Sequence, residues 1–389
     1  MNTSDNSFPP SGPRPAANAG GNLDLLSLHG GDILAQARKY GRRAADFIDF
    51  SSNTHVFAED VTARLIRETP VAYAIYPDSD CTALVGAISA HEELDPGRVL
   101  VGNGSADLIW LFMTAMAPRK VLLLGPMFSE YARVCVAFGI PYEVITPPPE
   151  QEFICGSSEL RRIWDSDADL AVVCCPNNPA AVAYPNIQEL FGVLRVPRVL
   201  VDNTYREFLW GEPEYSQNSY VAYSKWVRSG VALFTMNSFT KFYACPGIRL
   251  GYLLGGESQI RRLARIRPPW SVSSFAQDMG LAFLANMAEY RERLAPMRME
   301  RVDMARQTRR MECFNPDFVF EGPSFITAGL LPGLSSASLR EKLLEQGLIV
   351  RDCDSIPGMP SGFIRFQVRF HRDNELLMKS LGWYAERGW

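Results

Sequence analysis

The sequence predicts an α/β protein with a large doubly wound domain on a mostly parallel sheet and a smaller α+β domain. Short apolar runs that end in Gly, Pro, Asn or Asp recur along the chain, as buried parallel strands do. Longer helix-like stretches separate these runs, an alternation typical of a doubly wound sheet. After about residue 270 the pattern changes to a long, charged helical stretch and then shorter elements, which indicates the second domain.

The elements of the large domain follow in chain order. Buried strands are expected at residues 99–101, 121–124, 170–173 and 199–201. Helices are expected at 106–117 and 187–194, between pairs of these strands. Beyond them, residues 283–311 are expected to form a long helical stretch that is interrupted at Pro296, because proline lacks an N–H and clashes with the preceding turn.

The same patterns divide the chain into four segments. Residues 1–22 are rich in Ser, Pro, Asn, Ala and Gly, and have too few large apolar groups to offset the entropy of ordering, so a flexible tail is expected. Residues 23–54 are expected to form an arm that joins the small domain. The large domain, with the site, would span 55–270, and the small C-terminal domain 271–389.

Composition excludes several classes of function. The chain has 389 residues, of which 47% are hydrophobic and 21% charged, as in a globular enzyme. A net charge of -4 offers no attraction to nucleic acid or an anionic membrane. The start lacks the pattern of a signal peptide and no apolar run could span a membrane, so a cytoplasmic protein is expected. Eight cysteines without paired short spacings predict buried, reduced thiols and no metal site.

Lys241 lies in the segment most informative about chemistry, residues 237–252. Aromatic and apolar neighbours would desolvate its amine, lower its pKa and leave the neutral nucleophile that imine formation needs. Ser238 stands three residues before Lys241 and Arg249 eight residues after it. A hydroxyl and a guanidinium at these positions could hold a phosphate dianion beside the imine.

This Ser-x-x-Lys pattern with its following arginine resembles the fold type I pyridoxal-5'-phosphate (PLP) enzymes of the class I/II aminotransferase family. The resemblance covers nearly the whole chain after residue 22 and is closest to the threonine-phosphate decarboxylases, with the histidinol-phosphate aminotransferases next. It implies PLP as the cofactor, held by Lys241 as a Schiff base. It also implies an enzyme that acts at Cα of an amino acid through an external aldimine and a quinonoid.

The resemblance implies contacts at both ends of the cofactor. Gly104, Ser105 and Ala106 open a predicted helix after a strand, where backbone N–H groups and a hydroxyl would meet the phosphate. Thr240 belongs to the same cofactor-binding set. Asp202 ends a predicted strand, where its carboxylate would pair with the pyridinium nitrogen.

Four further positions match cofactor contacts of the family. Asn178 would donate to the phenolic oxygen of the cofactor, and Tyr205 would share that role. Phe128, or Tyr131 in its place, would stack on the ring. Tyr76 matches a tyrosine that reaches the cofactor phosphate of the neighbouring subunit, which implies a homodimer with shared active sites.

The substrate side resembles the phosphothreonine decarboxylases more narrowly. His29, Gly30, Asn53, Arg351 and Arg365 fall where that family contacts a phosphorylated amino acid. Two arginines and a histidine in one pocket suit an amino acid with an anionic group at each end.

Three stretches depart from the family near this pocket. Residues 51–57 read Ser-Ser-Asn-Thr-His-Val-Phe in place of Ser-Ala-Asn-Ile-Asn-Pro-Leu-Gly. The usual Asn-Asn-Pro-Thr-Gly ends in Ala-Ala at 180–181, and the usual Asp-Glu-Ala-Phe is Asp-Asn-Thr-Tyr at 202–205. The cofactor contacts survive while the surrounding wall changes, so we expect a different amino-acid substrate, with His55 facing it.

Several reactions stay open, because the Cα bond that stands perpendicular to the ring decides between them. A decarboxylase-like enzyme is the first expectation and an aminotransferase the second. A diverged enzyme doing elimination, replacement or carbon-carbon bond formation on a larger amino acid, such as S-adenosylmethionine, is the third. A PLP-binding transcription regulator is disfavoured, because the segment before His29 has almost no basic residues and is unlike a DNA-binding module.

Overall fold

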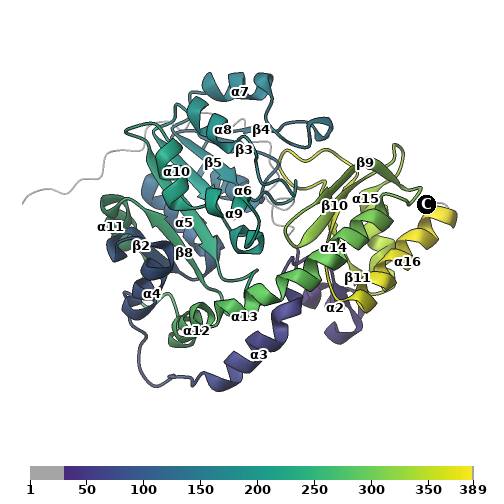
Figure 1. Ribbon diagram of the computed structural model, residues 1–389, viewed down its shortest axis with the longest axis horizontal. Helices are drawn as coiled ribbons and strands as arrows, with labels where there is room; N and C mark the ends of the chain where they lie inside the picture. Colours follow the sequence, from purple (N-terminus) through teal and green to yellow (C-terminus); the bar gives the residue numbers. More distant parts are fainter. Residues whose placement is uncertain (1–29, 388–389) are drawn as a thin grey trace, which may run out of the picture.

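The computed structural model describes residues 30–387, so the expected tail at 1–22 and the start of the arm lie outside the described residues. In this part of the chain the strands form a seven-stranded, a four-stranded and a two-stranded sheet. Figure 1 shows the seven-stranded sheet with its helices on the left and the four-stranded sheet on the right, with α13 and α14 running from one towards the other.

The seven-stranded sheet has the order β2-β8-β7-β6-β5-β3-β4. Its strands, in chain order, are β2 (Val99–Gly102), β3 (Val121–Leu124), β4 (Tyr142–Ile145), β5 (Leu170–Cys174), β6 (Arg198–Asp202), β7 (Ala232–Ser238) and β8 (Gly251–Gly255). Every neighbouring pair is parallel except the two that involve β8. The four strands predicted from the sequence are β2, β3, β5 and β6, and the mostly parallel sheet is confirmed.

Helices cover both faces of this sheet. Along β5, Leu170 and Val172 join one hydrophobic cluster, whereas Ala171 and Val173 join the other. The first cluster contains side chains of α5 (Gly104–Met116), α6 (Glu130–Phe138) and α11 (Glu257–Ile266). The second contains side chains of α4 (Thr82–Glu92), α8 (Ile187–Val193), α10 (Tyr220–Trp226) and α12 (Ser274–Ala285). Burial on both faces explains why the strands are continuous apolar runs, and it makes the domain doubly wound.

The four-stranded sheet is antiparallel, with the order β12-β13-β10-β9. Its strands are β9 (Phe314–Glu321), β10 (Phe325–Leu330), β12 (Arg351–Asp352) and β13 (Phe363–Gln367). The N-terminal arm reaches this part of the molecule, because β1 (Ile48–Asp49) pairs in parallel with β11 (Leu348–Ile349). The domain boundaries drawn from the sequence stay a prediction.

The other helices complete the chain. They are α2 (Ile33–Tyr40), α3 (Glu59–Glu68), α7 (Ser157–Trp164), α9 (Glu214–Gln217), α13 (Met287–Glu292), α14 (Leu294–Thr308), α15 (Ser336–Glu345) and α16 (His371–Arg387). Short 3-10 helices lie at Ala44–Asp46, Val56–Ala58, Pro96–Arg98, Pro149–Gln151 and Arg206–Leu209.

The predicted helix break at Pro296 is wrong. The helical stretch is interrupted at Asn286 and at Arg293, and Pro296 lies in the first turn of α14. Backbone N–H groups of a first turn have no intrahelical acceptor, so a proline there removes no hydrogen bond.

The eight cysteines are all buried and free of disulfides, as the sequence predicted. Burial raises the pKa of each thiol whose shift is large, for example that of Cys135 to about 12. Among residues 30–387, no helix combines the length and the apolar character that crossing a membrane requires.

Candidate active site

A cavity of about 190 Å³ lies at the carboxyl edge of the seven-stranded sheet, where β5, β6 and β7 end. Residues of the four-stranded sheet and of the arm close its other side. Thirteen residues that the sequence analysis selected line it: Gly30, Ser105, Ala106, Phe128, Asn178, Asp202, Tyr205, Ser238, Thr240, Lys241, Arg249, Arg351 and Arg365. The fold therefore brings together side chains that lie up to hundreds of residues apart in the chain.

Lys241 presents its amine to this cavity. It follows β7 by three residues, and its Nζ donates a hydrogen bond to the carbonyl oxygen of Ser52 at 2.6 Å. Burial, together with the positive charges of Arg365 and Arg249, lowers the pKa of Lys241 to about 8. A sizeable fraction of the amine is therefore neutral, and nucleophilic, near neutral pH.

Asp202, the last residue of β6, provides a buried carboxylate. Its Oδ2 accepts a hydrogen bond from the hydroxyl of Tyr131 at 3.0 Å, and its Oδ1 accepts one from the backbone N–H of Thr204 at 3.0 Å. Burial raises the pKa of Asp202, while these two donors oppose the shift by stabilising the ionised form. The carboxylate is held in one orientation at the cavity wall.

A close backbone approach forms the opposite corner of the cavity. Gly104 has a left-handed φ of 83°, and a Cβ atom there would lie 2.4 Å from Nη2 of Arg249. Gly251 is constrained by the same approach, because a Cβ would lie 3.0 Å from the backbone nitrogen of Ser105. These glycines let the start of α5 and the Arg249 guanidinium come together beside Ser238, and N–H groups, hydroxyls and a guanidinium are donors suited to a phosphate.

Two arginines from the four-stranded sheet face this set. Arg365 on β13 donates to the side-chain oxygen of Asn178, and its Nη2 donates to the carbonyl of Ser51 at 2.8 Å. Arg351 on β12 donates to Oγ of Ser355 at 2.9 Å. No carboxylate in the described part of the chain pairs with either guanidinium, so both can bind an anion in the cavity.

Four selected residues do not line the cavity, and His29 lies outside the described residues. Gly104 adjoins the cavity through its approach to Arg249, as described above. Asn53 is buried behind the wall and donates to the hydroxyl of Tyr205 at 3.4 Å. Tyr76 is 76% exposed and stacks on Trp270 with ring centroids 4.5 Å apart.

His55 is the selected residue whose position differs from the expectation. Its ring lies in the core, 5.5 Å from the rings of both Phe208 and Phe242, and Nε2 is 3.1 Å from the carbonyl of Tyr290. Burial lowers the pKa of His55 to about 4, so the ring is neutral. The expectation that His55 faces the substrate is therefore wrong in this structure, because apolar packing turns the side chain away from the cavity.

Sequence reasoning missed six residues of the cavity wall: Ser51, Ser52, Ser129, Cys174, Thr204 and Ile356. Cys174 could have been found, since it directly follows the predicted strand 170–173, as Asp202 directly follows the predicted strand 199–201. Ser51 and Ser52 precede the selected Asn53. Ile356 carried no signal, because an isoleucine in a loop is indistinguishable from one in the core.

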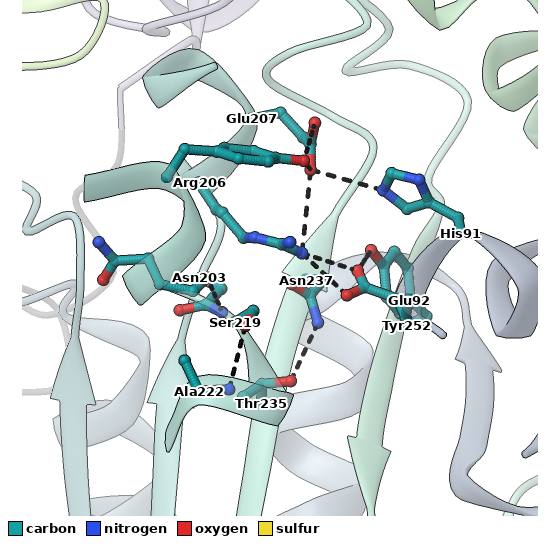
Figure 2. Close-up of polar contacts among 12 residues, drawn as sticks. His91, Glu92, Asn203, Arg206, Glu207, Ser219, Ala222, Thr235, Asn237 and Tyr252 are labelled. Atoms are coloured by element: carbon teal, nitrogen blue, oxygen red, sulfur yellow. Dashed lines mark hydrogen bonds and ion pairs between the residues drawn. The ribbon is translucent and has the colours of Figure 1, made fainter. Parts of the chain in front are cut away.

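The residues that directly follow Tyr205 belong to a buried charged cluster, in which Arg206 lies between Glu207 and Glu92 (Figure 2). Nη1 of Arg206 donates to both carboxylate oxygens of Glu92, at 3.0 and 2.8 Å. The hydroxyl of Tyr252 donates to the same carboxylate at 2.5 Å. This pair anchors the residues that follow β6 to the last turn of α4.

Glu207 extends the cluster. Its carboxylate lies 3.2 Å from Nη2 of Arg291 and 3.6 Å from Nε2 of His91. Burial opposes ionisation of Glu207, but the nearby His91, Arg206 and Arg291 outweigh it and lower the pKa of Glu207 to about 2. Residues 202–207 therefore present Asp202 and Tyr205 to the cavity while Arg206 and Glu207 are held by ionic contacts on the other side.

The fold and this cavity define an enzyme of the aminotransferase-like α/β class. The model of the family "Aminotransferase class I and II" matches residues 45–381, so the chain belongs to this family of PLP-dependent enzymes. The resemblance, the fold class and the enzyme class expected from the sequence are confirmed.

The curated relatives of this chain include two types of enzyme, so they do not decide which reaction this chain catalyses. The chain is 26% identical over 365 residues to threonine-phosphate decarboxylase of Salmonella typhimurium, covering 91% of this chain and 96% of the relative. It is 29% identical over 319 residues to histidinol-phosphate aminotransferase of Desulfitobacterium hafniense, covering 80% and 84%. Both enzyme types expected from the sequence are therefore among its relatives.

Solved structures support the fold. The L-threonine-O-3-phosphate decarboxylase from Porphyromonas gingivalis matches with a TM-score of 0.71 at 21% identity, over 87% of this chain and 99% of that one. The histidinol-phosphate aminotransferase from Sinorhizobium meliloti in complex with pyridoxal-5'-phosphate matches with a TM-score of 0.75 at 17% identity, over 95% and 98%. At these identities the likeness concerns the fold alone.

Proposed function

We propose that this chain binds PLP through Lys241 and acts at Cα of an amino acid that carries a second anionic group, as a decarboxylase. One observation carries the proposal: the Lys241 amine, the Asp202 carboxylate and an anion-binding corner share a cavity with two arginines that lack carboxylate partners among residues 30–387. The threonine-phosphate decarboxylase relative supports the choice of reaction.

The residues present fit the cofactor. Because residue 104 is a glycine, the guanidinium of Arg249 can lie against the start of α5, where a Cβ would displace it; Ser105 and Ser238 add hydroxyl donors, and the three together suit a phosphate. Asp202 would hold the ring nitrogen, and the amine of Lys241 would hold the aldehyde carbon. Bound PLP would supply an electron sink for the electron pair of a broken Cα bond.

The chain's own groups would orient the substrate and move its proton. Arg365 is fixed by Asn178 and by the carbonyl of Ser51, so its remaining donors point in a set direction and suit the α-carboxylate. Arg351 would take the second anion. The amine of Lys241, with a pKa of about 8, can both accept and return a proton near neutral pH.

An absorption spectrum tests the proposal. The purified protein is reconstituted with PLP and then mixed with O-phosphothreonine, histidinol phosphate or S-adenosylmethionine. We expect a visible band of lysine-bound cofactor that disappears in Lys241→Ala and persists in the control Lys225→Ala, a change at an exposed lysine. Absence of a band in the wild-type protein would contradict the cofactor assignment.

Product analysis separates the candidate reactions. Release of CO2 supports the decarboxylase, and a keto product supports the aminotransferase, which the histidinol-phosphate aminotransferase relatives favour as the second candidate. Loss of the substrate's side-chain leaving group, or a new carbon-carbon bond, would favour the diverged chemistry suggested by the changed residues at 180–181 and 203–204.

We propose in addition that the active enzyme is a homodimer. The segment before α4 exposes Tyr73, Ile75 and Tyr76 at 90%, 73% and 76%, and Trp270 stacks beside Tyr76. Such a group of exposed apolar side chains suits burial against a second copy. Sedimentation should give a dimer, and Tyr76→Ala should weaken both association and PLP affinity. A monomer with full PLP affinity would contradict the proposal.

A further inference from the structure

A second cavity, of about 150 Å³, adjoins the first. The two share Gly30, Ser51 and Arg351 as a common wall. The second cavity then continues between α2 and α15, where Gln36 and Arg340 line it. A substrate bound in the first cavity can therefore extend past Arg351 into further enclosed space.

Three guanidinium groups follow this route in the order Arg365, Arg351, Arg340. Arg365 lines only the first cavity, Arg351 lines both, and Arg340 lines only the second. The central one is 9% exposed, and burial together with repulsion from the other two lowers the pKa of Arg351 to about 10. The row carries positive charge that favours an anion at either end.

The two carboxylates that line the second cavity, those of Asp32 and Asp352, accept hydrogen bonds from backbone N–H groups. Oδ1 of Asp32 accepts the N–H of Ala35 at 3.1 Å, and Oδ1 of Asp352 accepts the N–H of Asp354 at 3.0 Å. Neither carboxylate forms an ion pair with Arg351 or Arg340 in the described part of the chain. The charge of Arg340 is shared instead with Glu341, which also accepts hydrogen bonds from Lys39 and Tyr40.

Gln36 supplies an unused acceptor in the same cavity. Its Oε1 is buried and has no hydrogen-bond partner in the described residues. A buried amide oxygen without a donor costs free energy until a ligand supplies one. The wall of the second cavity thus offers two cations and one acceptor to a bound group.

We propose that the second cavity binds the distal end of the amino-acid substrate: a phosphate or carboxylate held by Arg351 and Arg340, on a polar arm longer than that of O-phosphothreonine. A hydroxyl or N–H group on the arm would donate to Gln36. The inference rests on the proposed function, because it takes the first cavity as the place where the α-amino and α-carboxylate groups bind. It makes Arg340 a specificity-determining residue.

Calorimetry on the PLP-reconstituted protein tests the inference with matched ligands. The short ligands are aspartate and 2-amino-3-phosphonopropanoate, and the long ones are 2-aminopimelate and 2-amino-6-phosphonohexanoate. The long ligands should bind more tightly than the short ones with the same terminal group. In Arg340→Gln the affinity for a long ligand divided by the affinity for its matched short ligand should fall by about tenfold to a hundredfold, because one charge-assisted hydrogen bond is lost.

Two variants keep the result interpretable. Arg38→Gln removes an exposed charge from α2 and should leave the ratio unchanged, while Arg340→Lys keeps the charge and should restore part of it. Glu341 retains Lys39 and Tyr40 in both Arg340 variants, so folding, checked by thermal unfolding, should persist.

Three outcomes would overturn the inference: short ligands that bind more tightly than long ones, an equal loss for both in Arg340→Gln, or tighter binding of basic arms such as lysine. The cofactor band is scored separately. A missing band contradicts the proposed function, whereas a normal band with no preference for long ligands contradicts only the second cavity's role.

Discussion

The hydroxyl of Tyr131 lies 3.0 Å from Oδ2 of Asp202, and both side chains are buried. From the sequence, Tyr131 was an alternative ring-stacking residue beside Phe128. In the structure it contacts the carboxylate instead, and the N–H of Thr204 takes the other oxygen. The carboxylate is thereby held at the end of β6 by one donor on each side.

Replacing Tyr131 by Phe should therefore hold the Asp202 carboxylate less firmly while leaving no cavity in the core. The ring remains, but one donor to the carboxylate is lost, worth about 1 kcal/mol or roughly fivefold in PLP affinity. Titration of the cofactor-free protein with PLP measures this. The control is Tyr184→Phe, a buried tyrosine outside the cavity lining. Equal effects of the two changes would count against a role through Asp202.

Uptake of PLP by the cofactor-free protein should depend on the charge of Lys241. Only the neutral amine attacks an aldehyde, so the rate should rise with pH and level off above about 8, where the amine is mostly deprotonated. Burial is the main cause of the low pKa and Arg365 the next, so Arg365→Gln should move the midpoint to higher pH. Arg372→Gln, at an exposed site, should not move it.

Gly104→Ala should displace the Arg249 guanidinium. The new Cβ would lie 2.4 Å from Nη2 of Arg249 at a left-handed φ of 83°. We expect PLP affinity to fall by about tenfold or more, since a charge-assisted contact to phosphate is lost. Gly86→Ala is the matched control, because no atom lies within 4 Å of its Cβ position, and it should stabilise α4 by about 0.5–1 kcal/mol.

Glu92→Ala should destabilise the protein strongly. It removes the carboxylate to which the buried Arg206 donates and leaves that guanidinium only Glu207, 4.0 Å away, and breaking a buried ion pair typically costs about 3–5 kcal/mol. Urea unfolding of the variant measures the loss. Glu257→Ala removes an exposed partner of Arg261 and should cost less than about 1 kcal/mol. If the two variants lost similar stability, the buried charged cluster would not be the anchor that its contacts indicate.

His55 should make stability depend on acid pH. Its pKa falls from 6.5 in the unfolded chain to about 4 in the fold, so the unfolded state binds the proton first. The stability from keeping it neutral is complete above pH 6.5 and is lost as pH falls towards 4, a change of up to about 3 kcal/mol. His55→Leu should flatten the profile of unfolding free energy against pH, whereas His371→Leu, at a 65% exposed side chain, should not.

Much of the site could be predicted because its residues carry local signals. Ser238, Lys241 and Arg249 lie on one short segment, where spacing alone relates them. Asp202 ends an apolar run, and the carboxyl ends of parallel strands meet at one edge of a sheet. Side-chain positions that depend on packing were harder to predict from the sequence, as His55 shows.

The amino-acid sequence was enough to predict the α/β class, four strands and their positions along the chain, the Schiff-base lysine and the family. These follow from hydrophobic periodicity and from motif spacing, which are properties of short segments. The three-dimensional packing was needed to show that Pro296 lies in the first turn of a helix, that His55 lies in the core and that Arg340 and Arg351 line the same cavity. Such facts depend on which distant segments pack together, and neither periodicity nor spacing encodes the direction of one side chain relative to another far along the chain.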